Sequence, residues 1–318
     1  MLRTDSHRAA AACRHIWWAT LLVSLGLISS AESETSFVWL DYTQKELDRA
    51  YDQSVYAPNL VQVLERQAAN SEIARTHLGP PHKFSYGDGP NETLDVYSPA
   101  GTDAPIHIFI HGGTWRFGSA ENNAFAAENL VDAGRHFVVL DFSSIEIWDG
   151  DLRPLVDQIR RAIIWVFRHG QASFGGDPKH IHLSGFSSGG HLAGVMATTD
   201  WTVYQLPADL FAGVTLVSGM YDLSPVALSS RREYVSFNPA IIEELSPIRH
   251  IKNLHAPVTV VYGTEETPEF IRQAQEFVDA VVAHGKEASL IVGPKLNHFE
   301  LIETMASPFN VVGRVVRQ

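Results

Sequence analysis

The chain has 318 residues, of which 45% are hydrophobic and 19% charged, a composition typical of a globular protein with a large core. Its formal net charge of -12 argues against nucleic-acid binding, because surfaces that bind nucleic acids depend on clustered lysine and arginine. The single cysteine, Cys13, lies near the N-terminus, so the rest of the chain offers no disulfide, catalytic thiol or cysteine-ligated metal.

The first residues have the pattern of an export signal. Three arginines precede an apolar run over 16–28, and the small residues Ser29, Ser30 and Ala31 follow it. We therefore predict a signal peptide over 1–31, cleaved after Ala31, and a periplasmic or secreted mature protein over 32–318. The run is shorter than the roughly 20 residues that span a bilayer. An uncleaved anchor and a misassigned start codon remain the alternatives.

Helical spacing begins at Tyr42 and continues to Ala74, and Pro58 divides it into two short helices that we expect to form a lid or an edge. Strand and helix patterns then alternate. The expected strands are 83–86, 92–97, 105–110, 136–141, 180–183, 213–217, 258–262 and 288–292, and the expected helices are 122–133, 152–169, 192–199 and 269–283. This alternation predicts one α/β domain with a mostly parallel central sheet and helices on both faces.

Two further features complete this outline. Gly170 is expected to end the helix over 152–169. Three prolines interrupt 224–254, which we interpret as a small cap over the site.

A G-x-S-x-G sequence occupies 185–189, directly after an expected strand and before an expected helix. Small residues flank Ser187 because the sharp turn between strand and helix holds its hydroxyl out at the carboxyl edge of the sheet. Short glycine and serine sequences are usually ordinary loops, but this context favours a nucleophile at Ser187.

A serine nucleophile needs a base to take its proton and an acid to orient that base, in the chain order serine, acid, histidine. His298 follows the last expected strand and is therefore the predicted base. His111 and His191 are the rival histidines, and we expect both to shape the site instead of abstracting the proton.

The loop after the penultimate expected strand should supply the acid, and there we choose Glu266. Glu265 is the nearest competitor and Asp222 a weaker one. A loop rich in glutamate is often simply solvated, so this assignment depends on position alone.

A second glycine motif, His111-Gly112-Gly113, leaves the strand over 105–110. Glycines allow backbone N–H groups to face a substrate carbonyl, and together with the N–H of Ser188 they would form an oxyanion hole.

With these residues, the chain resembles the arylformamidase (kynurenine formamidase) group of α/β-hydrolases and, more distantly, the hormone-sensitive-lipase-like esterases. The likeness begins at about Leu40 and includes the sequences at 50–53, 111–115, 175–178, 218–223 and 297–299. It implies an α/β-hydrolase fold, a triad of Ser187, Glu266 and His298, and oxyanion donors at Gly112, Gly113, Thr114 and Ser188.

The resemblance also concerns the substrate pocket. It implies that Trp115 lies at the mouth of the acyl pocket, and we expect His191 and Met220 to contact the substrate as well. In this group of proteins, Asp usually stands at the position of Glu266, and an aromatic residue at that of Thr114.

These patterns predict a serine hydrolase that cleaves a small ester or amide through an acyl-enzyme and needs no metal or cofactor. Formamidase and exported carboxylesterase activities, the latter on aryl esters or carbamates, are both open. A non-catalytic binding protein with a hydrolase fold is the alternative from another class. The expected partner is a small molecule, with no nucleic acid and no stable membrane insertion after signal cleavage, and a homodimer is left open.

Overall fold

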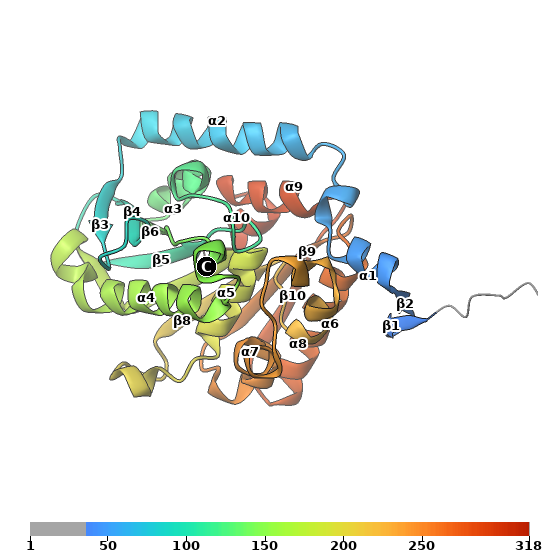
Figure 1. Ribbon diagram of the computed structural model, residues 1–318. Coiled ribbons are helices and arrows are strands. Elements are labelled where there is room, and N and C mark those ends of the chain that lie inside the picture. Colours follow the sequence, from blue (N-terminus) through green and yellow to red (C-terminus); the bar gives the residue numbers. More distant parts are fainter. Residues whose placement is uncertain (1–35, 318) are drawn as a thin grey trace, which may run out of the picture. The chain divides into compact units, whose positions relative to one another are not determined.

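A computed structural model describes residues 36–317, so the predicted signal peptide lies outside the described residues (Figure 1). Its main feature is an eight-stranded sheet in the order β10-β9-β8-β7-β5-β6-β4-β3. The strands are β3 (His82–Ser85), β4 (Thr93–Tyr97), β5 (Ala104–Ile110), β6 (His136–Leu140), β7 (Gly176–Phe186), β8 (Phe211–Val217), β9 (Val258–Gly263) and β10 (Ala288–Gly293). From β10 to β6 all neighbours are parallel, whereas β4 pairs antiparallel with β6 and β3 with β4.

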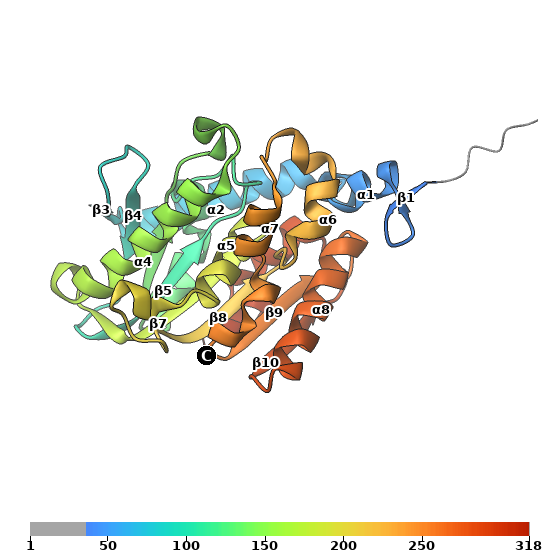
Figure 2. The ribbon, with the colours of Figure 1, turned by 60° about the horizontal axis from the view of Figure 1, so that its bottom comes forward.

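Helices pack on both faces of this sheet. They are α1 (Gln44–Ala50), α2 (Leu60–Leu78), α3 (Ala127–Asp132), α4 (Leu152–Phe174), α5 (Ser188–Ala197), α6 (Leu223–Leu228), α7 (Pro239–Leu245), α8 (Pro268–Ala283), α9 (His298–Glu303) and α10 (Val311–Val315). A hairpin of β1 (Phe37–Trp39) and β2 (Tyr42–Thr43) precedes α1. Figure 2 shows α4, α5 and α8 on the near face of the sheet.

The core has two layers because side chains of a strand alternate between the faces of a sheet. In β5, Ile106, Ile108 and Ile110 belong to the layer that includes α4, α5 and α8. Phe109, between them, belongs to the opposite layer with residues of α3, α9 and α10. The predicted fold, an α/β-hydrolase fold with a mostly parallel sheet covered on both faces, is confirmed.

Several predicted boundaries differ from the structure, among them the helix predicted over 122–133, which is the 3-10 helix Glu121–Ala126 followed by α3. The predicted end of the helix over 152–169 was wrong for an identifiable reason. Gly170 lies inside α4, which continues to Phe174 and ends at Gly175, whose φ of 77° is the left-handed conformation of a helix cap. A Cβ at Gly170 would lie 2.9 Å from Cζ of Phe174, so the Phe174 ring packs closely against this position.

The interrupted segment after β8 contains α6, the short 3-10 helix Ser230–Glu233 and α7. Its interpretation as a cap stays a prediction. No helix within residues 36–317 combines the length and the apolarity that crossing a membrane requires.

Candidate active site

Ser187 lies on a strained turn at the carboxyl edge of the sheet. It stands between the last residue of β7 and the first of α5, with φ 57° and ψ -122°. This backbone conformation costs free energy for a residue with a side chain, and it persists only where the surrounding structure imposes it. The flanking glycines allow the turn to close: a Cβ on Gly185 would lie 2.1 Å from the Gly189 carbonyl oxygen, and one on Gly189 would lie 2.1 Å from that of Ile110.

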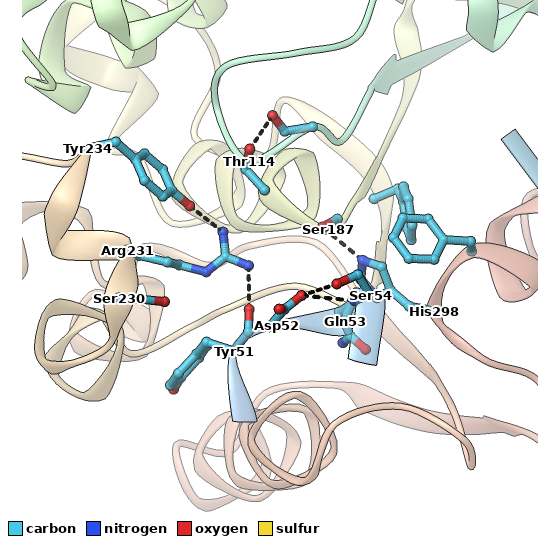
Figure 3. A pocket seen from close by; sticks show the side chains of 13 residues that line it. Tyr51, Asp52, Gln53, Ser54, Thr114, Ser187, Ser230, Arg231, Tyr234 and His298 are labelled. Atoms are coloured by element: carbon cyan, nitrogen blue, oxygen red, sulfur yellow. Dashed lines mark hydrogen bonds between the residues drawn. The ribbon is translucent and has the colours of Figure 1, made fainter. Parts of the chain in front are cut away.

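Three buried side chains form a continuous hydrogen-bonded chain at this turn. Oγ of Ser187 lies 2.9 Å from Nε2 of His298 (Figure 3). Nδ1 of His298 lies 2.7 Å from Oε2 of Glu266. With Nδ1–H donating to the carboxylate, Nε2 keeps its lone pair and can accept the serine proton. The residues follow β7, β9 and β10, because parallel strands bring their carboxyl ends to one edge of the sheet.

Further donors fix both oxygens of the Glu266 carboxylate. Oε1 accepts hydrogen bonds from the Gly263 N–H at 2.7 Å and the Ser218 hydroxyl at 2.6 Å. Oε2 accepts a third from the amide of Gln53 at 3.1 Å, besides the bond from the imidazole. The sequence did not reveal Gln53 and Ser218 as supports of the acid, because each is remote from Glu266 in the chain and follows no local pattern.

The rival residues have other partners. Glu265 is exposed, and Asp222 caps α6 by accepting from the Ser224 N–H. His111 bonds through Nδ1 to the Gly112 carbonyl and stacks on Phe142 with ring centroids 4.3 Å apart. None of these three side chains joins the Ser187–His298–Glu266 chain.

The glycine loop after β5 lies beside Ser187. Gly113 has φ 121°, and a Cβ there would lie 2.0 Å from the Phe117 carbonyl oxygen, so the turn requires glycine. The Gly113 carbonyl accepts hydrogen bonds from the N–H groups of Arg116 and Phe117. Within residues 36–317, the N–H groups of Gly113, Thr114 and Ser188 have no protein acceptor, which leaves them free to bind a substrate oxygen.

Three residues predicted to bind the substrate lie in the core. Trp115, His191 and Met220 are buried, and neither the cavity at Ser187 nor the neighbouring cavity at Gly113 includes them in its described wall. Trp115 points into the core because its Nε1–H donates to Nδ1 of His191 at 3.2 Å, while Nε2 of His191 bonds to the Leu245 carbonyl at 2.8 Å. Burial lowers the pKa of His191 to about 4, so this histidine is a neutral support beneath the loop.

Two cavities meet at Gly113 and Thr114. The first, which we call the Arg231 cavity, has a volume of about 320 Å³ and contains Ser187 and His298 in its wall with Asp52, Arg231 and Tyr234. The second, the α2 cavity, has a volume of about 490 Å³ and is lined mainly by apolar residues, among them Leu60, Leu64, Ala68, Phe117 and Phe299. Residues 36–317 contain no cluster of three or more histidine, cysteine or acidic side chains that could hold a metal ion.

The sequence of the chain is similar to those of known hydrolases. The kynurenine formamidase of Danio rerio is 30% identical over 280 residues, which cover 84% of this chain and 93% of that protein. The chain belongs to the kynurenine formamidase family. The kynurenine formamidase of Salmo salar is 29% identical over the same share of each chain.

Other proteins similar to this chain are esterases. Esterase LipC of Mycobacterium tuberculosis is 28% identical over 62% of this chain and 54% of its own length. The family described as BD-FAE matches residues 94–211, and the prolyl oligopeptidase family matches residues 162–312. Among solved structures, a proposed thioesterase from Silicibacter sp. TM1040 superposes with a TM-score of 0.74 at 27% identity, covering 86% of this chain and 99% of that one. The protein is therefore an α/β-hydrolase whose relatives include a formamidase and esterases.

Proposed function

We propose that the protein is a serine hydrolase that cleaves small amides or esters through an acyl-enzyme on Ser187. The observation that carries the proposal is the hydrogen-bonded chain from Oγ of Ser187 through the imidazole of His298 to Glu266, at 2.9 and 2.7 Å. A serine hydroxyl is a weak nucleophile until a base takes its proton, and this chain supplies such a base in the required tautomer.

The reaction then follows from these positions. Ser187 Oγ attacks the carbonyl carbon while Nε2 of His298 takes its proton, and Glu266 stabilises the imidazolium. The free N–H groups of Gly113, Thr114 and Ser188 bind the negative oxygen of the tetrahedral intermediate. His298 gives the proton to the leaving group, and water, activated by the same imidazole, releases the acid and restores Ser187.

Membership of the kynurenine formamidase family favours a formamide as the first substrate to test. The α2 cavity favours a second candidate, carboxylesterase activity: its volume of about 490 Å³ and its largely apolar lining next to Gly113 offer room for an acyl chain longer than a formyl group. We propose measuring hydrolysis of N-formylkynurenine and p-nitrophenyl butyrate side by side, with Ser187→Ala as the control. Turnover of either substrate that disappears in Ser187→Ala supports the serine mechanism. A folded protein that cleaves neither, or a Ser187→Ala variant that is as active as the wild type, would contradict it.

We also propose that the mature protein is exported after cleavage behind Ala31. The support is the sequence pattern of the first residues, and N-terminal sequencing of the protein from its native host tests it. A mature chain that begins at Met1 in the cytosol would refute this proposal.

A further inference from the structure

Arg231 is a buried cation in the wall of the candidate active site. It belongs to the 3-10 helix Ser230–Glu233 and lines the same cavity as Ser187 and His298 (Figure 3). The residue is only 6% exposed, although it carries a full positive charge.

Among residues 36–317, only neutral groups hold this guanidinium. One Nη donates to the Tyr234 hydroxyl at 2.8 Å, and the other donates to the Tyr51 carbonyl at 3.0 Å. Nε–H has no acceptor in the described part of the chain, and the indole ring of Trp115 lies 5.6 Å from Cζ. A guanidinium has five N–H donors, so most of its donor capacity is unused here.

No carboxylate of the described residues forms an ion pair with Arg231. Asp52 is the acidic residue in the wall of the same cavity, but it is exposed, and its Oδ1 accepts from the N–H and hydroxyl of Ser54. Arg272, by contrast, pairs with the buried Glu269 at 2.8 Å. Because burying an unpaired charge is costly, an arginine kept in this state beside a nucleophile is suited to an anion that arrives with the ligand.

We propose that Arg231 binds a carboxylate of the substrate and thereby makes the enzyme selective for anionic small amides and esters. This inference rests on the proposed function, since the bound anion must place a carbonyl at Ser187. A carboxylate fits the planar fork of a guanidinium, and such charge-assisted bonds are stronger than neutral ones. The Tyr51 carbonyl and the Tyr234 hydroxyl hold the guanidinium in one orientation, so less conformational entropy is lost when a ligand binds.

The test compares substrates in which a carboxylate is replaced by a carboxamide, and the spontaneous hydrolysis of each substrate is subtracted. 4-Acetoxybenzoate and 4-acetoxybenzamide place the carboxylate, or its neutral counterpart, on the leaving group. Monophenyl succinate and phenyl succinamate place it on the acyl group. We expect the wild type to cleave the anionic member of at least one pair with a kcat/KM about tenfold or more above that of the neutral member, as for a charged hydrogen bond.

Arg231→Gln should remove this preference while retaining hydrolysis of the neutral member. Arg231→Lys should lower it, because an ammonium cannot reach Tyr51, Tyr234 and a carboxylate together. Arg232→Gln is the matched control: Arg232 is exposed, binds Gln44 and the Leu228 carbonyl, and lies outside the Arg231 cavity, so the preference should be unchanged. Thermal melting of each variant checks folding.

The outcomes separate this inference from the proposed function. A wild type that cleaves both members of each pair equally overturns the role of Arg231, whether or not Arg231→Gln folds. So does an Arg231→Gln variant that slows both members by the same factor, since that result indicates support of the Trp115 loop. If no member is cleaved and a fluorophosphonate does not label Ser187, the proposed function itself fails.

Discussion

The Arg231 cavity and the α2 cavity meet at the same loop but differ in chemistry. The first presents a buried cation beside Ser187 and His298, whereas the second is lined largely by apolar side chains of α2 and of the residues facing it. Both reach Gly113 and Thr114, where free N–H groups can bind a carbonyl oxygen. The comparison teaches that bond cleavage and substrate choice are separable here: changes at the junction should affect every substrate, and changes in one cavity only some.

The largest expected effect is at Ser187, the proposed nucleophile beside this junction. Ser187→Ala should lower kcat/KM by about 10⁴-fold or more for anionic, neutral, small and bulky substrates alike, because no nucleophile remains for a substrate bound in either cavity. Steady-state assays over the four substrate types measure this loss. Ser85→Ala, an exposed serine of β3, should have wild-type activity. A loss confined to one type of substrate would contradict the separation of bond cleavage from substrate choice.

Removing the charge of Glu266 should slow the cleavage of substrates in both cavities equally. Glu266→Gln removes the charge that stabilises the imidazolium and fixes its tautomer, so kcat should fall by about 10² to 10⁴-fold for all substrates. Glu265→Gln is the matched control, since Glu265 is the exposed neighbour in the same loop, and its kcat should stay within about twofold of the wild type. The reverse order of effects would assign the acid to Glu265.

The α2 cavity can be filled without touching the triad. Ala68 lines it, so Ala68→Trp should lower kcat/KM for p-nitrophenyl butyrate by about tenfold, the effect of losing a few methylene contacts, and leave a small formamide unchanged. Ala69→Trp adds the same side chain to the exposed neighbour outside the cavity, and its rates should match the wild type. Equal losses for ester and formamide in Ala68→Trp would mean that bulky groups occupy another space.

The last expected effect is on stability instead of catalysis and concerns the support beneath the shared loop. Burial lowers the pKa of His191 from 6.5 to about 4, so the folded protein resists a proton that the unfolded chain binds. The contribution of this neutral histidine to stability is therefore full above about pH 6.5 and is lost as the pH falls toward 4. Between pH 7 and pH 4.5 it should lower the free energy of unfolding by about 2 to 3 kcal/mol.

Urea denaturation at both pH values, for the wild type and His191→Gln, measures this term. Glutamine does not titrate, so the variant should lose less stability on acidification by about that amount. Identical losses in both proteins would show that protonation of His191 does not limit stability in acid.

The sequence was sufficient where local pattern and chain order decide the structure. Alternating buried strands and amphipathic helices predicted the sheet, and the small residues around Ser187 predicted the turn between β7 and α5. Because parallel strands end at one edge, the position of His298 after β10 already placed it near Ser187.

Contacts between segments that are far apart in the chain could not be predicted from the sequence. Gln53 reaches Glu266 from the short helix before α2, and Arg231 enters the cavity from a segment that shows only interrupted helical patterns. Trp115 was expected in the substrate pocket, yet its indole turns into the core toward His191. The direction of an aromatic side chain in an irregular loop depends on tertiary packing, which no local pattern encodes.

The central claim, nucleophilic catalysis by Ser187, can be tested by mass spectrometry of the intact protein. The wild type is treated with a fluorophosphonate, and the modified peptide is sequenced. We predict one adduct, on Ser187, loss of hydrolysis in proportion to labelling, and no adduct on folded Ser187→Ala. Hydrolysis that continues at full rate in the fully labelled protein, or an adduct on another residue that alone abolishes activity, would contradict the account.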